Sequence, residues 1–584
     1  MNNALRFLIC LILNFMVTNC FSGVDDKTKA DMISNLEFIK RTLEVQYAPL
    51  EWKKEFMNWD IEDEFTKAID KVLYTDTVTT KNYQQIIKEF LGSTQDYHVQ
   101  ITFFSTEFSF LPFSVKTINQ KCFVDWVDDA YWPEGQVKLN QGDEILFFGG
   151  RPVEEVIEEI KIANGRRANT ATDQALADHT FTLRLGTAGN EVVNGDITIL
   201  VRTPMGETKA LELDWTYQPE KITSPNKLHL LLDMLEMREY RNPVEEKLKS
   251  LFHKLCMVTP LNHLQIKERE LRHGELGASK SSLPFLGKPI RVFEAKRFNE
   301  PEVRNSSGEI KPRKKINWFA YIYKNSDEKL IGYLRIPHYL GDDEDFFNCI
   351  PIIAYLEKHT DALVVDQLNN PGGYVSFMNQ LLSLLTPYPL TIPKHRVAIN
   401  QKEVMEAIKE IDELNDYVNF NFSENFLQQE GFRKIMNYYS FILEEWNNGR
   451  TLTDPVHLGG VEMIPPYRVH YSKPILMLIN ELDFSAGDFA PAILQDNRRA
   501  TLMGRGTAGA GGAVSDFSFP NRYGIKEISF TNTIAERNNL QKIENLGVIP
   551  EIKYDVTEED LRSGYQNFKD AINIAISELL DSNL

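Results

Sequence analysis

The chain has 584 residues, and 42% of them are hydrophobic, which is enough to bury large cores and too much for a wholly disordered protein. Sixty-four Lys and Arg residues stand against 83 Asp and Glu residues, so the formal net charge is −19. Nucleic acids and anionic membrane surfaces attract clustered positive charge, so this acidity argues against either as a general partner. At about 150 residues per domain, the length predicts roughly three or four domains.

Residues 1–22 have the pattern of a secretory signal peptide. A single charge, Arg6, precedes an apolar run over 7–17 that is shorter than the roughly 20 residues of a membrane-spanning helix. Cys20 leaves lipidation open as an alternative to simple cleavage, although the preceding Asn19 is larger than the small residue such sites prefer. We therefore expect an exported protein, with no later stretch apolar and long enough to span a bilayer.

Cysteine and histidine usage indicates neither a disulfide framework nor a zinc site. Beyond the leader the chain has Cys122, Cys256 and Cys349, which are too few and too scattered for a fold held together by disulfide bonds. The sequence contains no CxxC motif and no HExxH motif.

The first half of the chain predicts a helical lobe and then a small β domain. Over 23–98, apolar residues recur at helical spacing, as in Leu36, Ile39 and Leu43. Over 99–220, a Gly-Asp-Glu-Ile-Leu strand at 142–146 leads to a glycine turn and a helix, and alternating segments at 196–203 and 208–215 predict a hairpin. This arrangement resembles a PDZ domain, which binds an extended peptide as an added strand. A small β domain without a peptide groove fits equally well.

The second half predicts an α/β domain behind a linker. Residues 221–290 carry charge runs and a small-residue patch, which are typical of a protease-sensitive connector. Over 291–584, strands are expected near 318–324, 330–337, 361–366, 474–480 and 500–504, with helices over 374–385 and up to 494. Strands that each lead into a glycine-rich turn or a helix favour a mostly parallel sheet covered by helices. A helical insertion is expected at about 400–465. The fold class is therefore α/β multidomain.

Chemistry is indicated most clearly by Ser485, which follows an apolar strand within Asp-Phe-Ser-Ala-Gly-Asp and precedes a helix. A serine at a strand-to-helix turn exposes its hydroxyl, and the first N–H groups of the helix point toward whatever that hydroxyl attacks. Such geometry suits a nucleophile beside an oxyanion hole. Taken alone, the same serine fits a helix cap.

Two glycine-rich stretches could complete such a site. Asn-Asn-Pro-Gly-Gly at 369–373 follows a buried strand, and adjacent glycines allow close approach of the backbone to a ligand, although a plain turn fits too. The run at 504–512 lacks the Gly-Lys-Ser/Thr ending of a phosphate-binding loop, so we expect a wall of a substrate site there.

Taken together and in this order, these segments resemble the C-terminal-processing and tricorn-type serine peptidases, which combine a PDZ-like domain with a crotonase-like α/β catalytic domain. The resemblance spans nearly the whole mature chain. The segments that carry it are 47–49 with Trp52, 96–104, 366–373, 393–396, 480–485, 506–512 and 543–548.

The resemblance implies a Ser–His–Glu triad, with Ser485 as nucleophile, His98 as base and Glu544 as orienting carboxylate. The chemistry is consistent, because a serine needs a base of near-neutral pKa and that base needs an acceptor on its other nitrogen. Some relatives use a lysine base about two dozen residues after the serine, but here no lysine lies between Ser485 and Lys526. Oxyanion donors would be the N–H groups of Ala486 and of Gly372 or Gly373.

The resemblance further implies a secreted virulence-type endopeptidase that acts on host proteins, works as a homodimer and is made as a zymogen cleaved within 221–290. Its substrates would be proteins and peptides, and the chemistry needs no metal or organic cofactor. Two rivals remain open on sequence alone: a catalytically inactive peptide-binding scaffold, and a PDZ-type adaptor whose α/β part is structural.

Overall fold

The structure, a computed structural model, describes residues 26–128, 137–165, 170–220, 286–293, 319–420 and 426–582, together with Trp132 and Gly135. The predicted signal peptide at 1–22 and nearly all of the predicted linker at 221–290 lie outside these residues. Within the described ranges, no helix has both the length and the apolar character needed to cross a membrane.

The predicted N-terminal helical lobe is present. A helix over 26–46 is followed by α2 (Leu50–Met57), α3 (Ile61–Tyr74) and α4 (Thr80–Gly92). Asp60 caps α3 by accepting hydrogen bonds from two N–H groups of its first turn, as expected for an Asp N-cap. Leu36, Ile39 and Leu43 are fully buried, so the helical spacing identified the face that packs into the lobe.

A short three-stranded sheet joins this lobe to the C-terminal part of the chain. β1 (Gln100–Phe103) pairs antiparallel with β20 (Ile525–Thr531), which pairs with β19 (Val514–Phe517). The sequence placed residues 99–220 with the PDZ-like unit. Gln100–Phe103 pair instead with β20, while the N–H groups of Thr106 and Glu107 donate to Glu220 at the end of that unit. Side chains of β1 and β20 share one apolar core with the N-terminal helices. The lobe is therefore built into the body of the protein.

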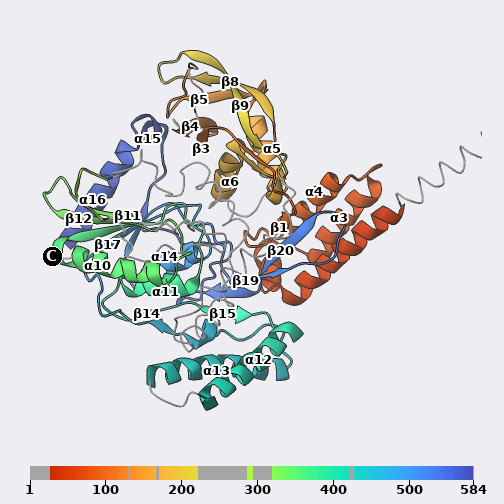
Figure 1. Cartoon of the computed structure of the whole chain (residues 1–584), viewed down its shortest axis with the longest axis vertical. Helices are drawn as coiled ribbons and strands as arrows, with labels where there is room; N and C mark the ends of the chain where they lie inside the picture. Colours follow the sequence, from red (N-terminus) through yellow and green to blue (C-terminus); the bar gives the residue numbers. More distant parts are fainter. Residues whose placement is uncertain are drawn as a thin grey trace, which may run out of the picture.

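The PDZ-like unit is a strongly curved antiparallel sheet with two helices, at the top of Figure 1. Its strands lie in the order β3-β4-β5-β8-β9-β2-β7, and the predicted hairpin is confirmed because β8 and β9 pair along their length. Its elements are β2 (Phe108–Phe110), β3 (Phe113–Ile118), β4 (Lys121–Val127), β5 (Glu144–Phe148), β6 (Arg151–Pro152), α5 (Val153–Ala163), α6 (Thr170–Thr182), β7 (Leu183–Leu185), β8 (Gly195–Arg202) and β9 (Thr208–Gln218).

Helix α6 connects this unit to the rest of the protein. The Thr172 hydroxyl donates to the carbonyl oxygen of Glu481 at 2.8 Å, and the Tyr97 hydroxyl donates to Asp173 at 2.9 Å. On its other side, Asp178 accepts from the main-chain N–H of Thr117 in β3 at 2.7 Å. One helix therefore contacts its own sheet and two loops of the neighbouring part of the chain.

The predicted α/β domain is confirmed, with the parallel sheet at its centre. The strand order is β10-β11-β12-β13-β17-β18-β22; pairing is antiparallel up to β12 and parallel from β12 onward. Every residue of β13 and β17 is buried, which explains their continuous apolar sequences. The strands are β10 (Pro289–Phe293), β11 (Phe319–Lys324), β12 (Leu330–Arg335), β13 (Ala362–Asp366), β17 (Ile475–Ile479), β18 (Thr501–Gly504) and β22 (Ile552–Lys553).

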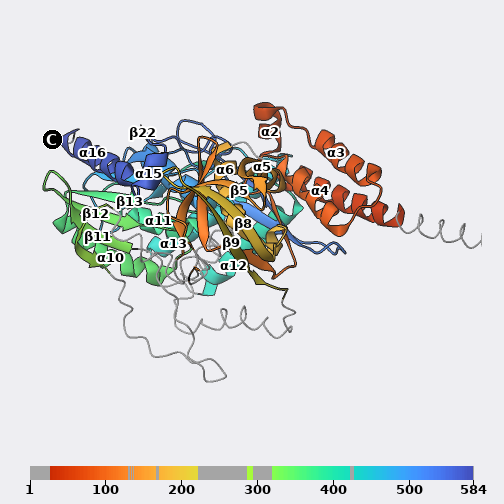
Figure 2. The same cartoon turned by 90° about the horizontal axis from the view of Figure 1, so that it is seen from above.

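Helices cover both faces of this sheet. On one face, α10 (Asp343–His359), α11 (Val375–Ser383) and α14 (Ala486–Asp496) contribute to the largest apolar core. On the other face, α16 (Gln566–Ser582) packs over the strands and follows the short α15 (Glu558–Arg562). The two views show α16 and α10 on opposite sides of the sheet (Figures 1 and 2).

The predicted helical insertion is a hairpin of α12 (Gln401–Phe420) and α13 (Phe426–Asn447) with its own apolar core. It lies at the edge of the molecule opposite the PDZ-like unit (Figure 1). Four short strands form its base in two antiparallel pairs, β14 with β16 and β15 with β21. They are β14 (Leu390–Thr391), β15 (Lys394–Val397), β16 (Met463–Ile464) and β21 (Thr533–Glu536).

The central strand provides a test of this core. Leu363 in β13 is fully buried, so Leu363→Ala should lower the free energy of unfolding by about 2–5 kcal/mol through lost burial and a residual cavity. Met205, which is 90% exposed in the β8–β9 turn, provides the control, since Met205→Ala should change stability by about 0.5 kcal/mol at most. Equal denaturant midpoints for the two variants would contradict this assignment of the core.

Candidate active site

Ser485 lies at the turn between β17 and α14, at the carboxyl edge of the parallel sheet. Its backbone has φ 56° and ψ −118°, a conformation that costs a non-glycine residue on the order of 1–3 kcal/mol. The Ser485 N–H donates to the carboxylate of Asp488 in the first turn of the helix at 2.9 Å. The turn thus presents Ser485 at the helix N-terminus in a strained but tightly held conformation.

Asp488 binds more than the N–H of Ser485. This buried carboxylate also accepts from the N–H groups of Gly509 and Ala510 at 2.9 and 3.0 Å and from the Thr507 hydroxyl. Burial raises the pKa of Asp488 to about 6, against the opposing effect of these hydrogen bonds. The glycine-rich loop expected to line the site is therefore fastened directly to the first turn of α14.

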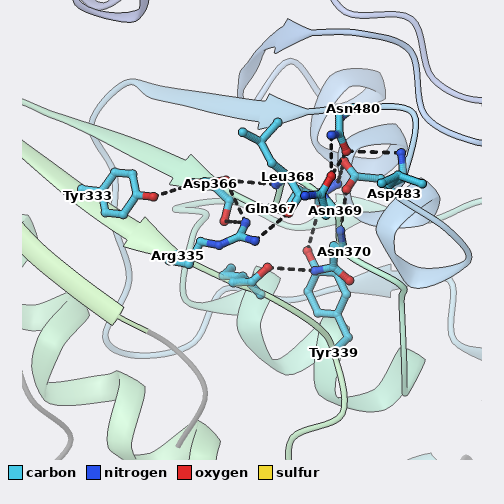
Figure 3. Close-up of polar contacts among 12 residues, drawn as sticks. Tyr333, Arg335, Tyr339, Asp366, Gln367, Leu368, Asn369, Asn370, Asn480 and Asp483 are labelled. Atoms are coloured by element: carbon cyan, nitrogen blue, oxygen red, sulfur yellow. Dashed lines mark hydrogen bonds and ion pairs between the residues drawn. The ribbon is translucent and has the colours of Figure 1, made fainter. Parts of the chain in front are cut away.

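A polar network joins the 369–373 loop to the residues that precede Ser485, and Figure 3 shows its contacts around Asn370 and Asp483. Asp483 Oδ1 accepts from the Asn370 N–H at 2.8 Å, and the Phe484 N–H donates to the Asn370 carbonyl oxygen at 2.9 Å. Gln367 Nε2 donates to the other oxygen of Asp483 at 3.0 Å. These bonds join the ends of β13 and β17, so the loop and the serine turn form one rigid unit.

Arg335 supports the same loop from the neighbouring strand β12. Its guanidinium group donates to Asp366 Oδ1 at 2.8 Å and to the Leu368 carbonyl oxygen at 2.6 Å (Figure 3). The Asn369 N–H donates to Asn480 Oδ1 at 2.8 Å on the opposite side. The loop therefore has polar support along its whole length.

Gly372 makes the closest approach to the serine. It has φ +86°, and a Cβ added there would lie 2.8 Å from Ser485 Cβ and 3.0 Å from the Ala486 nitrogen. Only glycine satisfies both the backbone conformation and the space. The sequence identified the glycine pair without showing which chain segment it meets, and the structure places Gly372 against the turn at Ser485.

The two glycines differ in how their N–H groups are used. The Gly372 N–H donates to the Asn370 side chain at 2.8 Å, which occupies it. Within the described part of the chain, no acceptor is found for the N–H groups of Gly373 and Ala486. Of the expected oxyanion donors, these two are therefore the ones available to a substrate oxygen.

His98 is carried on a short loop before β1 and is buried, with 1% of its surface exposed. Its main-chain N–H donates to Asp96 Oδ1 at 2.8 Å. The neighbouring Tyr97 ring packs edge-on against Phe484, with centroids 5.6 Å apart. The loop that carries His98 is thus packed against the residue that precedes Ser485.

Glu544 is fully buried on the loop after β21. Its Oε2 accepts from the Gly511 N–H at 3.2 Å, and its Oε1 forms an ion pair of 2.5 Å with Lys53. Burial and the nearby Asp96 carboxylate raise the pKa of Glu544 to about 8, although Lys53 acts in the opposite direction. The glycine-rich loop bonded to Asp488 is therefore also bonded to Glu544.

Asp96 and Lys53 both interact with Glu544, and the sequence analysis assigned neither of them a role. Asp96 is buried and accepts from the hydroxyls of Tyr47 and Thr531 at 3.0 and 2.7 Å. Its own burial favours the neutral acid, but the charges of Lys53 and His98 and its hydrogen bonds outweigh this, so the pKa of Asp96 is lowered. Asp96 lies within a segment that carried the family resemblance, which was the available signal. Lys53 is a single lysine in a charged helix, and nothing in the sequence distinguishes it as a site residue.

Comparison with known proteins gives two domain matches. A PDZ domain matches residues 107–222, and peptidase family S41 matches residues 330–554. Among whole-length relatives, a protein of Chlamydia pneumoniae is 32% identical, with 98% of this chain and 94% of the relative covered. A protein of Chlamydia trachomatis serovar D is also 32% identical, with 94% and 93% covered.

Solved structures agree over nearly the whole chain. The crystal structure of mature CPAF superposes with a TM-score of 0.73 at 28% identity, covering 95% of this chain and 98% of CPAF. A serine-to-alanine mutant of CPAF gives a TM-score of 0.76 at 29% identity, with the same coverage. Mature CPAF bound to lactacystin gives 0.74 at 28% identity, covering 95% and 99%.

The contact between Gly372 and Ser485 provides a test of the site geometry. Gly372→Ala should lower the rate at which a fluorophosphonate labels Ser485 by on the order of 10²-fold, because the added methyl group displaces the serine or the loop. Gly150→Ala is the matched control: Gly150 has φ +77°, but an added Cβ meets no atom within 4 Å. Equal labelling rates for the two variants would show that the approach of Gly372 does not matter.

Proposed function

This chain belongs to peptidase family S41 and is a serine peptidase, and we propose that it is an endopeptidase in which Ser485 is the nucleophile, His98 the base and Glu544 the orienting carboxylate. The resemblance to a serine peptidase family is confirmed, and the match to CPAF indicates a factor of the chlamydial protease-like type. The observation that carries the proposal is the strained Ser485 turn, with Gly372 packed against it and two unused N–H groups beside it.

In the proposed reaction, Ser485 Oγ attacks the carbonyl carbon of the scissile peptide bond while His98 takes its proton. The oxygen of the tetrahedral intermediate becomes negative, and the N–H groups of Ala486 and Gly373 would stabilise it. His98 then gives the proton to the leaving amine, which leaves an acyl group on Ser485. Water attacks this ester by the same steps in reverse order.

Glu544 would hold the imidazole in one tautomer and stabilise the imidazolium that forms during the transfer. It can do so only as the carboxylate. The carboxylate is the minor form below its pKa, so burial makes its availability depend on pH in the neutral to alkaline range.

The proteolytic role is tested by side-chain removal. Ser485→Ala should lower kcat/KM for casein by on the order of 10³-fold or more, and His98→Ala should have a comparable effect. Lys526→Ala, at an exposed position of β20, is the control and should leave the rate unchanged. Full proteolysis by Ser485→Ala would refute the nucleophile and leave the peptide-binding scaffold as the better description.

The pH dependence follows from Glu544. Since the carboxylate is the required form and its pKa is raised to about 8, kcat/KM should fall as the pH drops through about 8. In Glu544→Gln this titration is absent, so the lower residual activity should show no acid limb near pH 8. A wild-type acid limb already at about 6.5 would contradict the dependence on Glu544.

We further propose that the protein is exported through its N-terminal 22 residues, is made as a zymogen, acts on host proteins and works as a homodimer. The support is the signal-peptide pattern and the similarity to a protein whose structure is that of a mature form. Maturation within 221–290 would be self-cleavage, since the chain is itself a peptidase.

Self-cleavage is tested by following the purified chain over time. Wild-type protein should convert into two fragments that meet within 221–290, as mapped by mass spectrometry, while Ser485→Ala should stay intact. Conversion of Ser485→Ala at the wild-type rate would assign the cleavage to another protease. The mass of the processed species by light scattering gives its oligomeric state.

A further inference from the structure

A lysine of the N-terminal lobe is buried within the proposed active site. Lys53 lies on α2, and its side chain has no exposed surface. Its neighbour Lys54 on the same helix is 39% exposed and pairs with Glu51 on the surface. Burying an ammonium group is costly, and apolar residues of similar size usually pack at least as well, so such a lysine needs a specific reason.

Each N–H donor of the Lys53 ammonium group has a hydrogen-bond acceptor. It donates to Glu544 Oε1 at 2.5 Å, to Asn545 Oδ1 at 2.6 Å and to the carbonyl oxygen of Gln95 at 3.4 Å, which matches its three N–H donors. Asn545 Nδ2 also donates to Gln95 at 2.7 Å. One side chain therefore ties the segment before His98 to the segment that carries Glu544.

Two of the three residues that accept hydrogen bonds from Lys53 have a strained backbone. Gln95 and Asn545 both have positive φ, 50° and 64°, which is uncommon for non-glycine residues. Such conformations persist where the surrounding structure fixes them. The bonds from Lys53 and between the two residues supply that constraint at both places.

The buried charges give Lys53 a second role. Two carboxylates, Glu544 and Asp96, lie in this cluster, and both are affected by the charge of Lys53. With Lys53 charged, His98 neutral and both carboxylates ionised, the group of four carries one net negative charge. When His98 takes the proton from the nucleophile, the group becomes neutral. Without Lys53, two carboxylates would share a dry site, and one would take up a proton.

We propose that Lys53 is a positioning residue of the catalytic site: its ammonium group favours the carboxylate form of Glu544 against the effect of burial and holds it in place beside the His98 loop. The proposal rests on the triad proposed above. The N-terminal lobe then takes part in the catalytic site, because its residue Lys53 supplies the cation that favours the carboxylate form of Glu544.

A purely structural role would predict a different result. If Lys53 only anchored α2, its loss would lower stability and would reduce activity by the same factor at every pH. If Lys53 keeps Glu544 ionised, its loss should change the shape of the pH profile. The groups that face Glu544 in this cluster are Lys53 from α2, Asp96 from the loop before β1, and the Gly511 N–H from the glycine-rich loop.

The experiment compares Lys53→Met with Lys54→Met in the full-length chain. For Lys53→Met, kcat/KM for casein at pH 7.5 should fall by on the order of 10²-fold. The acid limb should move up by about one pH unit or more, so that activity is partly recovered at alkaline pH. Lys54→Met should match wild type in both respects. A Lys53→Met enzyme with an unmoved acid limb would overturn the proposal.

A second variant covers the case in which Lys53→Met does not fold. In Lys53→Met with Glu544→Gln, no buried carboxylate is left uncompensated at position 544, so the double variant should fold and be as active as Glu544→Gln alone. Failure of the double variant to fold would assign Lys53 to packing and overturn the proposal. If Ser485→Ala leaves proteolysis intact, the triad itself is wrong, which is a distinct failure.

Discussion

The site depends on a single constraint: a serine held at positive φ, in contact with a loop from the neighbouring strand. Ser485 could not keep this conformation alone, because its backbone is strained. Asp488 binds its N–H from within α14, and Asp483 ties the preceding turn to Asn370. Gly372 can then approach the serine because it has no side chain. Removal of any one of these contacts would loosen the others.

The parallel sheet explains why these groups meet. β13 and β17 are adjacent and parallel, so the loops after them emerge at the same edge. One loop supplies the glycine pair and the other supplies the serine and the helix N-terminus. Such an edge, where buried strands end beside a helix start, is where α/β proteins place their ligands. The parallel sheet thus brings the glycine pair and Ser485 together at one edge.

The other two residues of the proposed triad, His98 and Glu544, come from parts of the chain outside the central parallel sheet. His98 lies at the junction between the helical lobe and β1, and β1 is held by β20. Glu544 is buried beneath the glycine-rich loop and bonded to a lysine of the lobe. Helix α6 of the PDZ-like unit hydrogen-bonds beside both loops, at Tyr97 and Glu481. The lobe and the PDZ-like unit therefore both adjoin the site.

Local patterns account for what the sequence predicted well. Helical spacing identified the lobe, alternation identified the β8–β9 hairpin, and continuous apolar runs identified the buried parallel strands, because each depends on neighbours within a few residues. Family resemblance named the candidate site residues, and the loops that carry them contact one another. It did not assign β1 to β20, because strand pairing over hundreds of residues leaves no local signal.

By itself, the sequence determined the fold class, the strand-to-helix turn at Ser485 and the glycine pair that follows β13. Only the tertiary structure decided which glycine N–H remains available, since Asn370 occupies that of Gly372. It also decided that Lys53 is buried against Glu544 while Lys54 faces solvent. Both outcomes depend on which residues, distant in the sequence, lie next to the group in question. The role of a charged or hydrogen-bonding group can therefore be recognised only when its partner is known.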